Sequence, residues 1–339
     1  MPTTLIKETL PAQSLSSVPK TRVDWGEPVT VIDLTDLKDE VTSALEGQPK
    51  LIHIDRQIDF GPSDGAIAIG ANKVIKIAST PGHTYALDAH ENSNIIDIMY
   101  VDNVELYLEN IILRHSWGSS AVSVYGRYND IILQSGAILE HNESLGWGGA
   151  IGLQGRNCNI EVQDGAIVRF NKAEEGGGIS IAAADDALFS TLTVQPGALI
   201  DNNTADFRGG GILVYGGSIL IDGGTISNNR ATDGGGVSFI DTLSTYYDAY
   251  MHITGGLFTK NAATYGGGAI STGNAVDAKI SGNTQITYNK ANIGGGICAS
   301  IYRAGRRSDI DETNSKLTPV DLLISDDVQI SYNTAENGG

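Results

Sequence analysis

One short pattern recurs seven times between Leu139 and the C-terminus of this 339-residue chain. Each copy has an aliphatic residue or Phe, two variable residues, an Asn, one more variable residue, and then Ala or Ser. The seven Asn residues are Asn142, Asn171, Asn203, Asn229, Asn261, Asn289 and Asn333. Successive copies are 26 to 32 residues apart, except that 44 residues separate the last two. A period of a few tens of residues predicts a stacked array in which each repeat contacts only its neighbours.

Each repeat is typical of three short strands joined by sharp turns. Six residues before each Asn stands Gly, Asn or Asp, the residue types that adopt a left-handed backbone conformation at low cost. Short alternating apolar runs precede this turn, as at 131–133 and 160–162, and another strand is expected after the Gly-rich turn, beginning for example at Ile151. Helical periodicity is nearly lacking. We therefore predict an all-β fold, a parallel β-helix with coils about 4.8 Å apart.

The recurring Asn has a structural explanation. A side-chain amide both donates and accepts hydrogen bonds, so at a corner it can bond the turn backbone or the Asn of the next coil. We interpret the seven Asn residues as a structural ladder. The Gly triplets that follow them, such as 209–211 and 234–236, permit positive φ and close approach of coils. A nucleotide-phosphate loop is disfavoured, because such a loop needs a following helix and β-rich segments follow here.

The regular register defines the expected domain organisation. We assign residues 1–28 to an N-terminal extension and 29–339 to a single β-helix domain, with an irregular cap and first coils over 29–134 and regular repeats over 135–339. Residues 35–45 predict a short amphipathic helix that caps the first coil, with Leu37, Val41 and Leu45 on one face. The chain shows no signal peptide, lipidation motif or apolar transmembrane run, and it stops in mid-repeat. We therefore expect no membrane insertion in this segment and a continuation into further repeats or an anchor domain.

The composition is acidic, with 40 Asp and Glu against 22 Lys and Arg and a formal net charge of -18. Such a surface repels nucleic acid and anionic lipid, so nucleic-acid partners are not expected. Cys158 and Cys298 are separated by four or more expected coils, or roughly 20 Å at the strand spacing. Because this distance is too long for a disulfide, we predict two free, mostly buried thiols.

Both halves of the repeat carry a resemblance to known surface proteins. Residues 258–261 read Phe-Thr-Lys-Asn and residues 148–151 read Gly-Gly-Ala-Ile. This pairing resembles the repeats of chlamydial polymorphic outer-membrane proteins and of adhesin-like surface proteins of gut bacteria and archaea. In most copies here Ile, Leu or Val replaces Phe, and a third Gly replaces Ala. The resemblance implies a right-handed parallel β-helix displayed outside the cell, at its surface, for adhesion or ligand capture.

Aromatic residues beside the Gly runs are the main binding candidates. Stacking is expected to align the residues before these runs along one edge, where flat rings suit sugars. The ligand-binding candidates are Trp117, Trp147, Phe207 and Tyr265, with the basic cluster Arg303, Arg306 and Arg307. We expect a non-catalytic adhesin or glycan-binding stalk whose partner is a glycan or a surface component of a host or neighbouring cell. No catalytic residue, metal ligand or cofactor is assigned.

Two other function classes stay open. Pectin-cleaving enzymes share this architecture, so a polysaccharide lyase, a glycoside hydrolase or an inactive descendant is the first alternative; its carboxylate pairs would be Asp185 with Asp186 and Asp326 with Asp327. A purely structural spacer is the second alternative. The nonapeptide of calcium β-rolls is missing, but a calcium site assembled across loops is compatible with the sequence.

Overall fold

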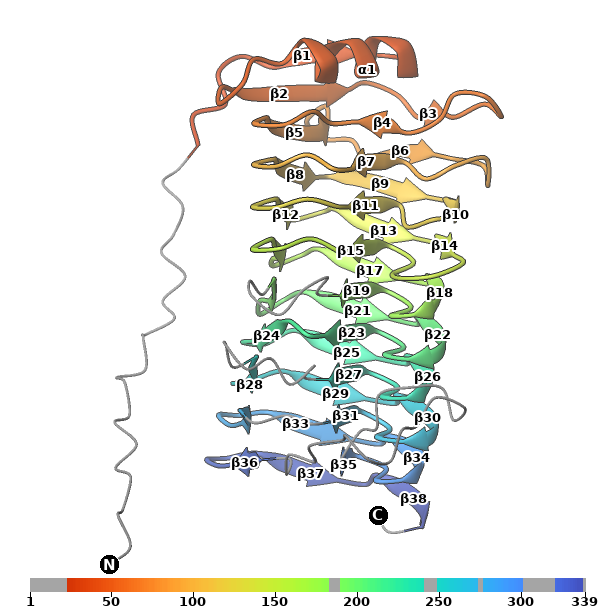
Figure 1. Cartoon of the computed structure of the whole chain (residues 1–339), viewed down its shortest axis with the longest axis vertical. Helices are drawn as coiled ribbons and strands as arrows, with labels where there is room; N and C mark the ends of the chain where they lie inside the picture. Colours follow the sequence, from red (N-terminus) through yellow and green to blue (C-terminus); the bar gives the residue numbers. More distant parts are fainter. Residues whose placement is uncertain (1–22, 183–189, 241–248, 274–276, 301–320, 338–339) are drawn as a thin grey trace, which may run out of the picture.

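The computed structural model describes residues 23–182, 190–240, 249–273, 277–300 and 321–337. Its strands form an elongated stack of coils, with the only helix of the described residues at one end (Figure 1). Neighbouring strands in each sheet are parallel and come from successive coils. The predicted all-β parallel solenoid is therefore confirmed.

The strands form four parallel sheets, numbered here in the order in which the chain visits them within a coil. The first sheet contains β1 (Val29–Val31), β2 (Pro49–Ile54), β5 (Val74–Ser79), β8 (Glu105–Glu109), β12 (Asp130–Leu133), β16 (Asn159–Val162), β20 (Thr191–Val194), β24 (Ser218–Ile221), β28 (Met251–Ile253), β32 (Ala278–Ile280) and β36 (Leu322–Ile324). The second contains β3 (Ile58–Asp59), β6 (Tyr85–Asp88), β9 (Ile111–Arg114), β13 (Ile138–Glu140), β17 (Ile167–Arg169), β21 (Leu199–Asp201), β25 (Thr225–Ser227), β29 (Leu257–Thr259), β33 (Gln285–Thr287) and β37 (Gln329–Ser331).

The two remaining sheets follow the Asn of each repeat. The third sheet contains β10 (Trp117–Gly118), β14 (Glu143–Ser144), β18 (Lys172–Glu175), β22 (Thr204–Arg208), β26 (Arg230–Asp233), β30 (Ala262–Gly266), β34 (Lys290–Ile293) and β38 (Thr334–Asn337). The fourth contains β4 (Ile67–Ala68), β7 (Ile96–Ile98), β11 (Val122–Val124), β15 (Ile151–Leu153), β19 (Ile179–Ala182), β23 (Ile212–Tyr215), β27 (Val237–Ile240), β31 (Ile270–Gly273) and β35 (Ile297–Ser300). The third sheet adds a strand where the sequence predicted only a corner.

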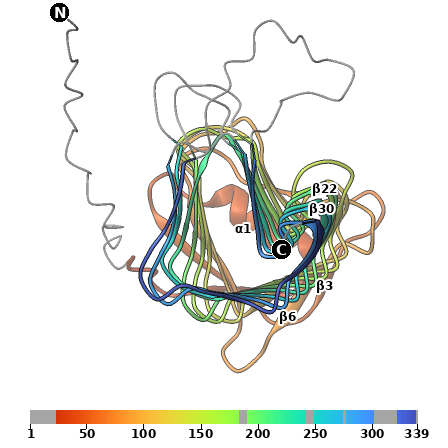
Figure 2. The same cartoon turned by 90° about the horizontal axis from the view of Figure 1, so that it is seen from below.

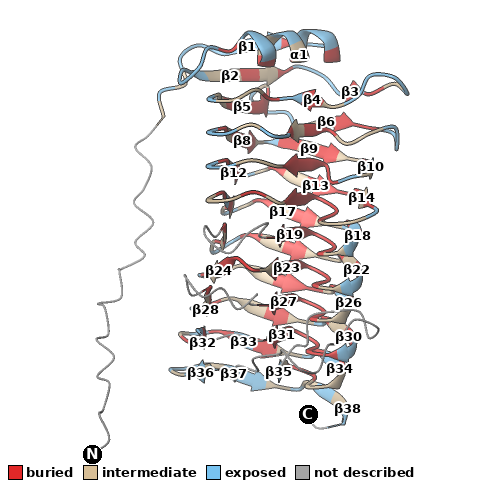
Figure 3. Cartoon of the chain, viewed as in Figure 1, coloured by how far each residue is buried: buried red, intermediate tan, exposed pale blue. Residues whose placement is uncertain are grey.

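Apolar side chains fill the interior of the coils. Seen along the axis, the coils superimpose (Figure 2), and buried residues recur along the strands through most of the stack (Figure 3). The residue three positions before each Asn is buried in the first six repeats, for example Leu139, Ile200 and Phe258. Ile330, in the seventh repeat, is 46% exposed.

The Asn side chains form a continuous hydrogen-bonded column at the corner between the second and third sheets. Asn171 Nδ2 donates to the side-chain oxygen of Asn203 at 2.9 Å and to the backbone carbonyl of Leu139 at 2.9 Å. The backbone amide of Asn171 donates to the same Asn203 oxygen at 3.0 Å. The same three bonds recur for each Asn from Asn142 to Asn289. Each side-chain amide thus satisfies a backbone amide and a backbone carbonyl of the preceding coil, and it donates to the Asn side chain of the following coil.

The Gly-rich turns depend on close backbone approach. A Cβ atom at Gly210 would lie 2.3 Å from the carbonyl oxygen of Gly235 in the next coil, so no larger residue fits. The turn six residues before the Asn has positive φ at Gly136, Gly165 and Gly197, as predicted. In the later repeats the positive φ moves by one residue, for example to Gly224, because these turns differ in shape.

A helix covers the first coil, as predicted. It is α1 (Leu34–Ser43), and Asp33 caps its N-terminus by accepting a hydrogen bond from the Asp36 amide at 2.9 Å. Leu37 and Val41 are buried under it. The prediction that Leu45 shares this face is wrong, because the helix ends before Leu45, which is 63% exposed.

Neither Cys158 nor Cys298 forms a disulfide. Cys158 is buried and Cys298 is partly buried. The lack of a disulfide agrees with the prediction from the spacing of the coils.

Candidate functional site

The predicted row of residues beside the Gly runs is aligned over most of its length. Trp147 forms an isolated bridge to Glu175, which is then paired with Arg208 on β22. Trp117 is paired with Glu143 on β14 instead. Arg208 is paired with Asp233, Asp233 with Gly266 next to Tyr265, and Gly266 with Ile293. The residues before the Gly runs are therefore aligned from Trp147 onward, as predicted, whereas Trp117 lies outside this alignment and Tyr265 is one residue out of register.

The other candidate residues also lie apart. Phe207 and Tyr265 are 51% and 54% exposed on the third sheet, and β26 lies between their strands. Trp117 is 48% exposed at the start of β10. The basic candidates Arg303, Arg306 and Arg307 lie outside the described residues, as does the carboxylate pair Asp185 and Asp186.

A hollow of about 330 Å³ lies where the third and fourth sheets approach each other in the early repeats. Its walls come from the segment after β7 and from the region of β10, β11, β14 and β15. The hollow is lined by apolar, aromatic and uncharged polar side chains, which include those of Met99, Ser119, Ser123, Tyr125, Trp147 and Gln154. None of the described residues that line it is charged. We call this site the neutral hollow.

Hydrogen bonds fix the polar groups of the neutral hollow. Tyr125 hydroxyl donates to the side-chain oxygen of Gln154, and the hydroxyls of Ser119 and Ser123 are 3.0 Å apart. Ser120 donates to the carbonyl of Trp147 at 2.8 Å, which holds the turn that carries the indole. The wall therefore combines preorganised hydroxyl and amide groups with aromatic surface.

The space of the neutral hollow depends on a glycine in its wall. A Cβ atom at Gly152 would lie 2.2 Å from Ser120 Oγ and 2.7 Å from the Trp147 carbonyl oxygen. Only Gly leaves this wall open.

Aromatic rings continue along the edge of the neutral hollow. The Trp147 ring contacts Tyr215 edge to face, with centroids 6.2 Å apart, and the Tyr125 ring lies 5.3 Å from that of Tyr100. Tyr100 is 80% exposed. Concave sites that combine apolar rings with a few fixed polar groups are typical of small-molecule and sugar binding.

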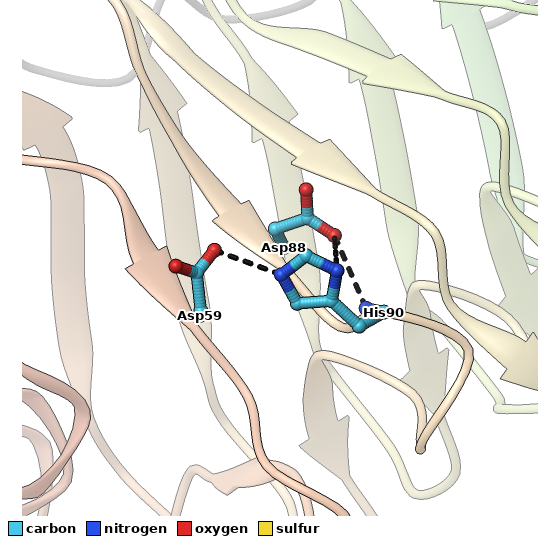
Figure 4. A group of neighbouring side chains, drawn as sticks. All are labelled: Asp59, Asp88 and His90. Atoms are coloured by element: carbon cyan, nitrogen blue, oxygen red, sulfur yellow. Dashed lines mark hydrogen bonds and ion pairs between the residues drawn. The ribbon is translucent and has the colours of Figure 1, made fainter.

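A second cluster lies on the second sheet at the other side of the Asn corner, and it contains two carboxylates and an imidazole. Asp59 on β3 is directly paired with Asp88 on β6. The His90 ring lies between the two carboxylates, 3.0 Å from Asp59 Oδ1 and 3.6 Å from Asp88 Oδ1 (Figure 4). One ligand atom from each residue lies within 4.8 Å of the others. We call these three residues the Asp–His cluster.

The Asp88 carboxylate is the fixed member of the Asp–His cluster. Its side chain is 2% exposed, and it accepts from Arg114 Nε at 2.7 Å, from His115 Nδ1 at 2.9 Å and from the His90 backbone amide at 3.1 Å. Burial acts to raise the pKa of Asp88, but the bonds from His115, His90 and Arg114 outweigh it and lower this pKa below its ordinary value. Asp88 is therefore ionised at neutral pH. Asp59 and His90 are about half exposed.

Charges alternate along the column to which Asp88 belongs. The paired residues on successive strands are Asp59, Asp88, Arg114, Glu140, Arg169 and Asp201. Arg114 pairs with Asp88 at 2.7 Å, and Arg169 pairs with Glu140 at 2.7 Å. Within this column, Asp59 and Asp88 are the one pair of like charges in adjacent strands.

Sequence reasoning identified Trp147 but missed the other members of both sites. His90 follows Asp88 by two residues, but its left-handed backbone and half-exposed side chain resemble those of His115 and His141, each of which comes one residue before the buried corner position. No local sequence pattern therefore identified the Asp–His cluster. Tyr125 and Gln154 likewise had no local signal, since their contact depends on the pairing of β11 with β15.

Comparison of the chain with models of protein families, with curated proteins and with solved structures gave no match. Within the described residues, α1 is too short to cross a bilayer as a membrane-spanning helix. The proposed function is therefore based on the fold and on the geometry of the two sites.

Proposed function

We propose that this solenoid is a non-catalytic glycan-binding protein that binds an uncharged oligosaccharide in the neutral hollow. The observation that carries the proposal is the wall of the hollow: aromatic rings and hydrogen-bonded hydroxyl and amide groups without a charged side chain, in a chain of net charge -18. Sugars without charge need apolar surface for their ring faces and neutral partners for their hydroxyls.

The resemblance of the repeats to surface-protein repeats supports a place outside the cell. In this proposal the solenoid is a rigid segment of a surface protein, and its ligand is a glycan of a host, of a neighbouring cell or of the surrounding matrix. The acidic remainder of the surface favours uncharged over acidic glycans, since like charges repel.

A glycan array tests the proposal directly. We expect the purified chain to bind neutral oligosaccharides, and Trp147→Ala and Gln154→Ala each to weaken binding by roughly tenfold, or about 1.4 kcal/mol. Trp117→Ala, next to the hollow, is expected to have a smaller effect. Phe207→Ala is the matched control, because it removes an exposed ring on the same sheet outside the hollow.

Three results would contradict the proposal. If the chain binds no neutral glycan, the alternative of a purely structural spacer is favoured. Unchanged binding in both hollow variants would move the site elsewhere. Cleaved oligosaccharides in the supernatant would show an enzyme, and attention would then turn to the carboxylates.

A further inference from the structure

We propose that the Asp–His cluster binds a divalent transition-metal ion of the zinc type, which links β3 to β6 near the capped end of the solenoid. The ligands are a carboxylate oxygen of Asp59, a carboxylate oxygen of Asp88 and a ring nitrogen of His90. The inference is independent of glycan binding in the neutral hollow.

The first support is the arrangement of charge. Like charges directly opposite each other on neighbouring strands are destabilising. Along the column from Asp59 to Asp201 the signs otherwise alternate, so stacking itself neutralises each charge. Asp88 is paired with Arg114, whereas the one neighbour of Asp59 in this column is another carboxylate, and a bound metal ion would supply the cation that Asp59 lacks.

The second support is the convergence of the ligand atoms. The three atoms lie within 4.8 Å of one another, although Asp59 and Asp88 belong to different coils. His90 has a left-handed backbone with φ of 47°, and this turn places its ring between the carboxylates (Figure 4). A modest shift of the half-exposed Asp59 and His90 side chains brings all three onto one ion.

The third support is that Asp88 is held as metal ligands are held. Arg114 and His115 donate to it from β9 and the following residue, so its carboxylate cannot rotate away. An ionised carboxylate has about four acceptor positions. Three donors occupy Asp88, so one position is left for an ion. Outer residues that orient a ligand in this way are general in metal sites.

The ligand types decide the class of metal. Imidazole nitrogen combined with carboxylate oxygen is typical of Zn²⁺ and related transition ions. Calcium prefers about six to eight oxygen ligands and is disfavoured by the imidazole. Three protein ligands leave the remaining coordination position to water at this half-exposed site. The His90 ligand would be a lone pair of one ring nitrogen.

Calorimetry on the chelator-treated, tag-free chain tests the proposal, with Zn²⁺, Mn²⁺ and Ca²⁺ as probes. We expect one Zn²⁺ to bind and to raise the melting temperature. Asp59→Asn and His90→Gln should each weaken Zn²⁺ binding at least tenfold and abolish the thermal shift. Circular dichroism verifies that these variants retain the fold, which we expect because both side chains are half exposed.

His252→Gln is the matched control. His252 also contacts a carboxylate at 3.0 Å, that of Asp277. Among the described residues, no third metal-binding side chain joins this pair. Its replacement should leave the affinity for Zn²⁺ unchanged. The proposal is overturned if Asp59→Asn and His90→Gln bind Zn²⁺ as the natural chain does, or if Ca²⁺ raises the melting temperature as much as Zn²⁺.

Discussion

Two columns of side chains run along the same corner of the solenoid, and they follow different rules. The Asn column is neutral, buried and made of one residue type, because an amide donates to its successor and accepts from its predecessor. The neighbouring column from Asp59 to Asp201 is charged and alternates in sign along most of its length. A self-complementary residue can repeat indefinitely, whereas a charged residue cannot.

This difference distinguishes the residues that build the scaffold from those that form a candidate site. Where the Asn column is regular, its residues are explained by stacking alone. At the capped end, two carboxylates face each other with the His90 ring between them, so stacking no longer explains the residues. Departures from the repeat are therefore the places to look for chemistry.

The largest effect is expected when the neutral column is broken. Asn229→Ala removes an acceptor for the backbone and side chain of Asn203 and a donor to Ile200 and Asn261, all in a buried corner. Because buried polar groups lose their partners, we expect the free energy of unfolding to fall by about 3 kcal/mol or more. Urea unfolding followed by circular dichroism measures this.

Asn159→Ala is the control for this prediction, since Asn159 is exposed and its side chain donates to the Asp130 carboxylate at the surface. Its cost should stay below about 0.5 kcal/mol. Equal losses in the two variants would show that the column contributes nothing special.

An intermediate effect that depends on pH is expected at Glu175, on β18 of the third sheet. Burial raises the pKa of Glu175 to about 7, with Arg208 opposing the rise and Glu174 and Asp233 adding to it, and one Glu175 oxygen is buried without a partner. A carboxyl whose pKa is raised on folding stabilises the fold at low pH, and this stability is lost as pH rises toward about 7. Glu175→Gln should therefore gain stability relative to the natural chain between about pH 4 and pH 8.

The expected gain for Glu175→Gln is about 1 to 2 kcal/mol once partial solvent screening is allowed for. Thermal unfolding at the two pH values measures it. Glu174→Gln, at the exposed neighbouring position, should show no comparable pH-dependent difference. A gain of the same size at both pH values would exclude ionisation of Glu175 as the cause.

The smallest effect concerns the like-charge pair. In the metal-free chain, Asp59→Asn removes one of two facing carboxylates and keeps an acceptor for His90, so we expect stability to rise by about 0.5 kcal/mol. Arg169→Gln, which removes the cation paired with Glu140 in the alternating part, should lower it. Melting temperatures measured in the presence of a chelator test both expectations. If Asp59→Asn lowers the melting temperature as much as Arg169→Gln does, the two ends of the column do not differ in the way proposed.

Much of the fold was predictable because its causes are periodic. The Asn register located the corner, the Gly triplets located the close contacts, and the spacing of Cys158 and Cys298 excluded a disulfide. The third sheet was not predictable in the same way, since its strands, such as Thr204–Arg208, contain register shifts that do not follow an alternating apolar pattern. The residues before the Gly runs still align from Trp147 onward, but Trp117 and Tyr265 fall outside that alignment.

The candidate sites depend on pairings that no local pattern reveals. Trp147 was visible beside its Gly run, but Tyr125 and Gln154 meet only because β11 lies against β15. Asp59 and Asp88 likewise meet because the coil between them, which includes β4 and β5, has the length that brings β3 into register with β6.

By itself, then, the sequence determined a parallel β-solenoid and its Asn column, because residues that bond their own copies make any periodic chain stack in one register. Only the tertiary structure decided which unlike residues became neighbours across coils. Their placement depends on loop lengths and register shifts that vary from coil to coil, and it produced the neutral hollow and the Asp–His cluster.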